Sequence, residues 1–124
     1  MLLTVGSALS AQVQHGPRGM YCGGNQLVYA GSLRDAHVTG IVVDPSGAAI
    51  PRARIQVQLQ GSDKILRDVK ADAEGRFRLP RLPRGSYWLG ISSPGFNLHY
   101  WELKIVHRTR TTKLSYGFEL GLGT

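Results

Sequence analysis

Cysteine is almost absent from this sequence: Cys22 is the only one among 124 residues. An internal disulfide is therefore impossible, and a zinc site would need several further ligands at suitable spacing. The histidines include no close pair that could supply such ligands; they are His15, His37, His99 and His107. We therefore expect neither a metal site nor a bound cofactor.

Long hydrophobic runs are absent as well. No run reaches the roughly 18 consecutive apolar residues that a membrane-spanning helix needs, so we expect no transmembrane helix. The chain shows no internal repeat, and its 124 residues are enough for one ordinary domain but too few for two. Apolar residues make up 42% of the sequence, which is enough to build a packed core.

Glycine, proline and basic residues, in contrast, are plentiful. Sixteen glycines and six prolines, spread along the chain, favour short strands joined by turns over long helices. Fifteen Lys and Arg residues against eight Asp and Glu give a net charge of +7. Such an excess attracts anionic partners over long range, but these residues are not grouped along any helix. Basic side chains scattered over a solvated surface explain the charge, so we expect no specific nucleic-acid partner.

The first twelve residues are apolar and small, like the hydrophobic part and cleavage end of a secretory signal peptide. Ala8 and Ala11 would stand near the cleavage site, although the usual positively charged start is missing. A frayed apolar tail is the alternative. On the first interpretation residues 1–12 are a signal peptide remnant, and the protein is secreted, periplasmic or exposed at the cell surface.

Residues 13–36 contain many glycines and show little periodicity, which predicts a flexible leader. Within this leader, residues 26–30 could add one short strand. The pattern changes at His37, where a β-branched run begins. We therefore expect a single β-domain over residues 37–122.

Seven short strands are expected from His37 onward, separated by closely spaced turn signals. The clearest of them spans residues 52–60, which alternate strictly between apolar and polar. The alternation places Ala53, Ile55, Val57 and Leu59 inward and Arg52, Arg54, Gln56, Gln58 and Gln60 in water. Such spacing is typical of an all-β fold, a seven-stranded antiparallel Greek-key β-sandwich.

Six short motifs, which follow one another at suitable distances, carry a more specific resemblance. They are VTGIVVD (38–44), GAAIP (47–51), ARIQV (53–57), ADAEGRFRL (71–79), LPRGSY (82–87) and PGF (94–96). In this order they resemble the carboxypeptidase regulatory-like domain, over roughly residues 37–115. The resemblance implies a transthyretin-like β-sandwich that has no catalytic residues of its own. It further implies an accessory module, found beside metallocarboxypeptidase domains, at the front of outer-membrane transport receptors and in exported bacterial proteins.

The motif residues also have a structural explanation. Gly47 and Gly75 stand in tight turns that need a positive φ or a close backbone approach. Phe77 and Tyr87 are spaced to fill one core, and a buried Tyr87 hydroxyl would need a backbone partner. The complete set of structural motif residues is Gly47, Gly75, Phe77, Gly85, Tyr87, Pro94 and Gly95.

Three aromatic residues are candidates for ligand or partner contact. Trp88 points opposite to Tyr87 and is expected to be exposed, as is one of Tyr100 and Trp101. Exposed rings stack on sugars or on an apolar patch of a partner. The alternative is that these rings cover the edge of the sandwich or pair across strands. Nearby basic residues could add polar contacts to an anionic glycan or a partner; they are Arg84, Arg108 and Arg110.

No catalytic constellation stands out. There is no Gly-x-Ser-x-Gly elbow and no local partner for a catalytic histidine, and His99 is expected on the outer face of a strand. Asp44, Asp72 and Glu74 stand near turns, where carboxylates that cap the turn are more common than a calcium site. We therefore expect no catalytic residues.

The favoured function is a non-enzymatic accessory or interaction module of a secreted or cell-envelope protein, such as the leading domain of an outer-membrane transport receptor. It would contact a protein partner, a neighbouring domain or a second copy of itself by edge-strand pairing or patch docking. The first alternative is a carbohydrate-binding module that uses Trp88 and Trp101. A transthyretin-like hydrolase is disfavoured, because residues 115–124 depart from the Tyr-Arg-Gly-Ser ending of those enzymes.

Overall fold

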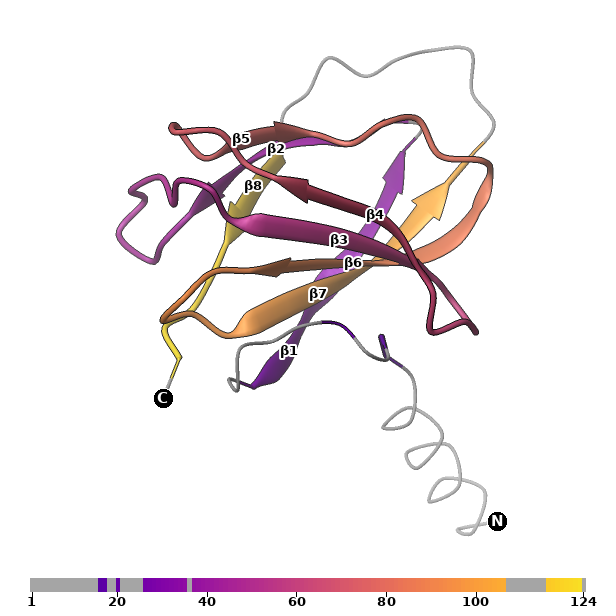
Figure 1. The fold of residues 1–124 in the computed structure, drawn as a ribbon, viewed down its shortest axis with the longest axis horizontal. Coiled ribbons are helices and arrows are strands. Elements are labelled where there is room, and N and C mark those ends of the chain that lie inside the picture. Colours follow the sequence, from indigo (N-terminus) through magenta and orange to yellow (C-terminus); the bar gives the residue numbers. More distant parts are fainter. Residues whose placement is uncertain (1–15, 18–19, 21–25, 36, 107–115, 124) are drawn as a thin grey trace, which may run out of the picture.

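The protein folds into two β-sheets packed face to face. The computed structural model describes residues 16–17, 20, 26–35, 37–106 and 116–123. The larger sheet has the order β1-β7-β6-β3-β4 and the smaller sheet the order β5-β2-β8 (Figure 1). The strands of the described residues are β1 (Leu27–Asp35), β2 (Thr39–Val43), β3 (Arg54–Leu59), β4 (Ile65–Lys70), β5 (Arg76–Arg78), β6 (Gly85–Ser92), β7 (Leu98–Ile105) and β8 (Tyr116–Glu119).

The prediction of an all-β sandwich is confirmed, and β2 to β8 are the seven strands expected from residue 37 onward. Two details differ. Leu27–Asp35 forms a nine-residue strand, so this part of the expected flexible leader is ordered and belongs to the larger sheet. The sheets are also not wholly antiparallel, because β1 pairs with β7 and β2 pairs with β8 in parallel. Alternation of polar and apolar residues reports which face a side chain takes, and it carries no information about strand direction.

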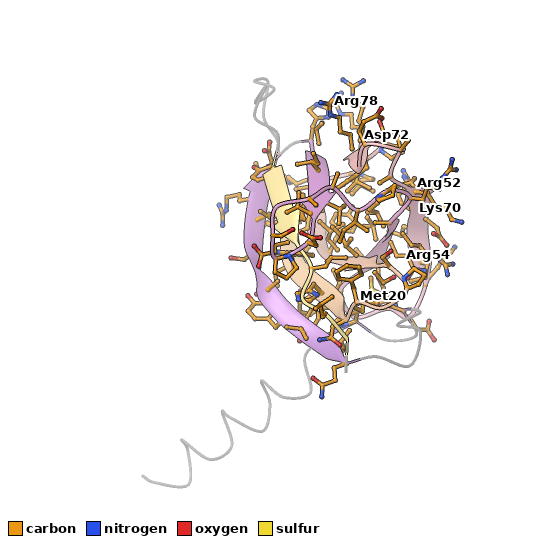
Figure 2. The ribbon with its side chains drawn as sticks, turned by 90° about the vertical axis from the view of Figure 1, so that its left-hand side faces the viewer. Met20, Arg52, Arg54, Lys70, Asp72 and Arg78 are labelled. Atoms are coloured by element: carbon orange, nitrogen blue, oxygen red, sulfur yellow. The ribbon has the colours of Figure 1, made fainter. Side chains whose placement is uncertain are left out.

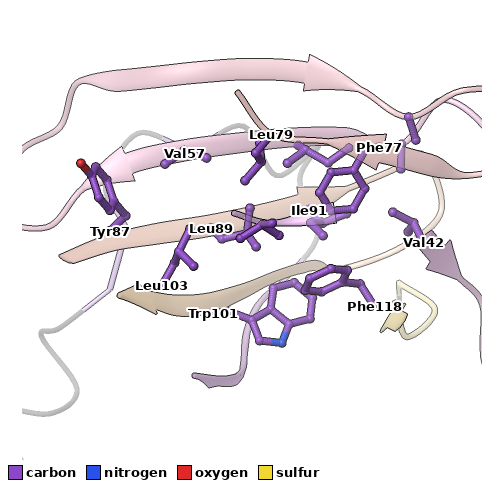
Figure 3. Packing of buried hydrophobic residues seen from close by; sticks show 14 of the residues in the cluster. Val42, Val57, Phe77, Leu79, Tyr87, Leu89, Ile91, Trp101, Leu103 and Phe118 are labelled. Atoms are coloured by element: carbon purple, nitrogen blue, oxygen red, sulfur yellow. The ribbon is translucent and has the colours of Figure 1, made fainter. Parts of the chain in front are cut away.

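The core lies between the two sheets: alternate residues of β3, β6 and β7 meet Val42 of β2, Phe77 of β5 and Phe118 of β8 (Figure 3). Leu89 and Ile91 of β6 and Leu103 of β7 are completely buried there. Trp101 packs edge-on against Phe118 of β8, with ring centroids 4.9 Å apart. The Tyr87 hydroxyl donates to the carbonyl oxygen of Pro83 at 2.6 Å, as the sequence predicts for a buried phenol.

Turns in the described chain use the carboxylates and glycines that the sequence indicates. Asp44 Oδ1 accepts from the backbone N–H groups of Ser46 and Ala48 at 2.9 and 3.0 Å. Asp72 Oδ1 accepts in the same way from Glu74 and Arg76, at 2.9 Å each. The adjoining turn glycines, Gly47 and Gly75, have φ values of +89° and +77°, which favour glycine.

Candidate functional site

The side of the larger sheet that points away from the core carries buried residues of its own. Trp88 is 7% exposed and Leu98 is fully buried, yet neither belongs to the cluster between the sheets. Gln56 and Gln58 of β3, which share this side by register, are buried too. We call this side, on which Trp88, Leu98 and Tyr100 lie, the outer face. It is therefore not an ordinary solvated sheet surface.

Met20 lies on the outer face, over β6 (the residue is labelled in Figure 2). A Cβ atom placed on Gly90 would overlap the Met20 sulfur, and it would lie 3.5 Å from Cδ2 of Leu98. Gly16 approaches the same face, since a Cβ atom there would lie 3.4 Å from the Tyr100 hydroxyl. The described residues of the N-terminal segment thus cover part of the outer face.

Three aromatic rings form a row across the outer face. Trp88 and Tyr100 meet edge-on with ring centroids 5.6 Å apart, and Tyr100 and Tyr29 follow at 5.5 Å. The row runs from β6 through β7 to β1, the edge strand. Exposure rises in that order: Trp88 is buried, Tyr100 is half-buried and Tyr29 is 52% exposed. We call these three residues the aromatic row; Tyr29 is its accessible end.

A groove of about 310 Å³ adjoins the aromatic row. Most of its lining side chains are polar; the described lining residues are Ser32, Leu33, Arg34, Gln60, Ser86, Glu102, Leu103 and Lys104. Gln60 is fixed in place, because its amide nitrogen donates to the Tyr87 carbonyl at 3.2 Å and its backbone N–H to the Ser86 carbonyl at 3.1 Å. We call this feature the polar groove. Its volume lies at the low end of the roughly 300–1,000 Å³ of small-molecule sites.

A bulge in β1 decides which residues of that strand reach the groove. Tyr29 pairs with Tyr100 and Gly31 with Trp101, so Ala30 is the extra residue. The φ value of Gly31 is +139°, which a side chain would disfavour. As a consequence Ser32 and Arg34 share the outer face with Tyr29, although an unbroken alternation from Tyr29 would place them on the opposite face.

Charge is unevenly distributed in the polar groove. The Tyr29 hydroxyl donates to Glu102 Oε1 at 3.4 Å. Desolvation raises the pKa of Tyr29, and the negative charge and hydrogen bond of Glu102 raise it further. Arg34 and Lys104 are direct partners in the register of β1 and β7, and both are exposed. Two cations thus line the groove side by side on neighbouring strands.

The sequence-based expectation about the tryptophans is wrong. Trp88 does point away from Tyr87, but it is buried because the outer face is itself covered. Trp101 is 8% exposed because it faces the core. Of the three aromatic candidates, Tyr100 alone is partly exposed on the outer face, as expected for one of Tyr100 and Trp101. A sugar platform made of Trp88 and Trp101 is therefore excluded, since the two rings lie on opposite sides of the larger sheet.

Of the three arginine candidates, Arg84 is the one that lies within the described residues. Arg84 is exposed at the residue before β6 begins. Arg108 and Arg110 lie outside the described residues.

Four further side chains also differ from expectation. Gln56, which was expected in water, is only 4% exposed. Gln58 is completely buried beside Trp88, its register partner on β6, whereas Leu59 is 41% exposed at the end of β3. His99 is buried instead of lying on an outer face. The Gly121 N–H donates to His99 Nε2 at 3.2 Å, so His99 Nδ1 carries the proton and donates to the Asn97 carbonyl at 3.1 Å. His99 therefore fastens the segment after β8 to β7.

Six residues of the groove region were not predicted from the sequence; Ser86 and Glu102 are two of them. Tyr29, Ser32 and Arg34 lie in a segment whose glycines predicted a flexible leader. Lys104 was placed in a strand, but as one basic residue among many. The alternation of residues 98–106 does indicate that Lys104 points outward; its neighbour across the sheet comes from β1 and could not be inferred.

The acidic side chains of the described residues mostly serve structure. Asp68 forms an ion pair with Arg54 at 2.7 Å, and the Arg54 hydrogen bond is the main reason that the pKa of Asp68 is lowered. Within the described ranges, no three His, Cys, Asp or Glu residues gather in a way that could hold a metal ion. A search of the same residues for a helix long and apolar enough to cross a membrane gave none.

Comparison with solved structures gives distant likenesses. Catechol 1,2-dioxygenase from Pseudomonas arvilla C-1 is similar at 14% identity and a TM-score of 0.48, over 98% of this chain and 67% of that enzyme. Wild-type catechol 1,2 dioxygenase from Acinetobacter radioresistens is similar at 13% identity and a TM-score of 0.47, over 86% of this chain and 60% of the enzyme. Likenesses of this size carry no argument about activity. No curated protein matches the chain.

Comparison with protein families is more informative. The model of one family, the carboxypeptidase regulatory-like domain, matches residues 37–114. The match includes β2 to β7, whereas β1 and β8 lie outside it. It covers more than half of the 124 residues and includes the six motifs of the sequence analysis. This chain belongs to the carboxypeptidase regulatory-like domain family.

Proposed function

We propose that this domain is a non-catalytic accessory module of an exported or cell-surface protein and that it contacts a partner through its outer face. The observation that carries the proposal is the aromatic row. Tyr29, Tyr100 and Trp88 stand on the side of the larger sheet that the core does not use. Aromatic rings gathered away from the core are typical of contact surfaces, where they bury a large area at small entropic cost.

Three further observations support the proposal. Met20 already lies over Gly90, which indicates that the outer face can hold a chain segment. Two side chains with catalytic potential have structural partners: His99 accepts a hydrogen bond from the Gly121 N–H, and Asp68 forms an ion pair with Arg54. The family to which the chain belongs is described as regulatory-like, which agrees with an accessory role.

Photo-crosslinking in the full-length protein tests the contact. A benzophenone amino acid placed at Tyr29 should give one dominant adduct, either with one other protein or with a neighbouring part of the same polypeptide. The same amino acid at Glu74, an exposed position in the turn before β5, is the matched control and should give no such adduct. Equal adducts at both positions, or none at Tyr29, would contradict the proposal.

Export is the second part of the proposal, and the composition of residues 1–12 supports it. Residues 1–36 should direct a fused alkaline phosphatase, which is active only after export, across the inner membrane of a bacterial host. The control fusion carries residues 13–36 alone and should stay inactive. Equal enzyme activity of the two fusions would rule out a signal peptide in residues 1–12.

A further inference from the structure

We infer that the polar groove binds an acidic saccharide, with the carboxylate of a hexuronate residue held between Arg34 and Lys104. This inference rests on the proposed function, because it takes the outer face as the contact face, and it adds the chemical class of a ligand. It is carried by the placement of charge and hydrogen-bonding groups in the groove.

Arg34 and Lys104 form a pair of cations that no acidic side chain of the described residues neutralises. Arg34 and Lys104 are register partners on neighbouring strands, and like charges in that position destabilise a sheet. All eight acidic side chains of the sequence lie in the described part of the chain. Within that part, the one ion pair is between Arg54 and Asp68. No acidic side chain therefore pairs with Arg34 or Lys104, and an anionic ligand would remove their repulsion.

A second pair of facing cations shows the contrast. Arg54 and Lys70 are also register partners, on β3 and β4, and Figure 2 shows both on one side of the molecule. The repulsion between Arg54 and Lys70 is already relieved, because Asp68 accepts two hydrogen bonds from the Arg54 guanidinium at 3.1 and 2.7 Å. Glu102 lines the same groove, but no ion pair joins it to Arg34 or Lys104 within the described residues. The pair in the groove can therefore take an external carboxylate.

The remaining groups of the groove restrict the ligand to a molecule with hydroxyl groups. The Ser32 and Ser86 hydroxyls can donate or accept, and the Glu102 carboxylate accepts only. Glu102 would repel a ligand that is anionic over its whole length, but it accepts readily from a sugar hydroxyl. A hexuronate matches this arrangement, since it has one carboxylate and several hydroxyl groups on one ring.

Tyr29 adds a stacking surface at the border of the groove. Its ring is 52% exposed, and its hydroxyl is held by Glu102 at 3.4 Å. The apolar face of a pyranose ring packs well on such a ring. An acidic peptide fits less well, because a peptide needs apolar anchors and the two leucines of the groove are engaged with the core. They are Leu33 and Leu103.

Calorimetry on the full chain with defined trisaccharides tests the inference. A galacturonate trimer should bind at least tenfold more tightly than a neutral galactose trimer of the same linkage. Arg34→Gln and Lys104→Gln should each weaken binding of the galacturonate trimer by tenfold or more. The controls Lys64→Gln and Arg81→Gln remove the same charge at exposed positions outside the groove and should change its affinity less than twofold.

Thermal unfolding gives a second readout that also shows whether the variant folds. Arg34→Gln should fold and melt at the wild-type temperature or above, because it removes a like-charge contact. The galacturonate trimer should raise the melting temperature of the wild type and leave that of Arg34→Gln unchanged.

Three results would overturn the inference: equal binding of the neutral trimer, equal loss in the Lys64→Gln control, or equal binding of a hexaglutamate peptide. If saccharide binding fails while crosslinking from Tyr29 succeeds, the inference is wrong and the proposed function stands. If crosslinking fails while the trimer binds, the protein contact is wrong instead.

Discussion

The Tyr116 hydroxyl donates a hydrogen bond of 2.5 Å to Asp35 Oδ2, across 81 positions of sequence. Asp35 ends β1 at the edge of the larger sheet, and Tyr116 begins β8 at the edge of the smaller sheet. The bond therefore joins the two sheets along one side of the sandwich. Asp35 is only 6% exposed, so it needs such a partner. The same bond raises the pKa of Tyr116 to about 12, with desolvation and the Asp35 charge adding to it.

Removing this hydrogen bond should weaken the protein and change its response to high pH. Tyr116→Phe should lower the free energy of unfolding at pH 7 by about 1–3 kcal/mol, because a buried carboxylate loses a donor. In the wild type, the folded-state pKa lies above the ordinary tyrosine value of 10.0. The contribution of Tyr116 is therefore complete below pH 10 and is lost as the pH rises from 10 to about 12.

Urea unfolding between pH 8 and 12 measures this difference. The free energy of unfolding of the wild type should fall more steeply above pH 10 than that of Tyr116→Phe. The two proteins differ at this position alone, so the difference between the two curves isolates Tyr116. Parallel curves over the whole range would show that the hydrogen bond with Asp35 does not hold in solution.

Two turn glycines should differ in their tolerance of a side chain. Gly47 and Gly75 both have positive φ, so replacement by alanine should cost each about 1–2 kcal/mol of backbone strain. At Gly75 the new Cβ would also lie 2.8 Å from the Val42 carbonyl oxygen, whereas at Gly47 it would meet nothing within 4 Å. Gly75→Ala should therefore destabilise the domain more than Gly47→Ala in chemical denaturation. A larger loss in Gly47→Ala would contradict the close approach of the turn before β5 to β2.

Gly90 should be coupled energetically to Met20. A methyl group at Gly90 collides with the Met20 sulfur, so Gly90→Ala should displace the N-terminal segment from the outer face. In a double-mutant cycle, Gly90→Ala should cost less stability in a Met20→Ala background than in the wild type. Limited proteolysis should cut the chain before β1 faster in Gly90→Ala. Additive free energies together with unchanged proteolysis would rule out packing of Met20 on β6.

Deleting single residues tests the bulge in β1. Removing Ala30 takes out the extra residue and leaves Ser32 and Arg34 on the outer face, so the variant should keep most of its stability. Removing Leu33 instead moves Arg34 to the position that faces the core, which buries a charge. The second deletion should lower the melting temperature far more than the first. Similar melting temperatures for both would show that β1 does not follow this register.

The inner layer of the sandwich could be predicted closely, and the outer face could not. Leu89 and Ile91 stand at alternate positions of β6, and their burial is what the period of a strand requires. The same rule correctly turned Trp88 away from the core. The rule did not predict that Trp88 is buried, because burial on the outer face depends on what lies over the sheet. A strand pattern reports two faces and cannot tell whether the second one is covered.

The candidate site was predicted only in part for a related reason. Tyr100 and Trp88 were singled out as aromatic residues, and the structure does bring them together. Arg34 was missed because the glycines around it indicate a linker, and its partner Lys104 is 70 positions away along the chain. Pairing between strands so distant in sequence depends on loop closure and on the whole sheet, which local composition does not encode.

By itself, the sequence determined the all-β class, the strands from His37 onward, the turn carboxylates and the family. These follow from short-range chemistry: side-chain alternation sets the faces of a strand, and Asp and Gly set its turns. Only the tertiary structure decided that β1 joins the larger sheet in parallel, that its bulge turns Arg34 toward Lys104, and that Met20 lies over Gly90. Each of these features depends on which distant segments pack together to bury apolar surface. That packing is cooperative and involves the whole chain.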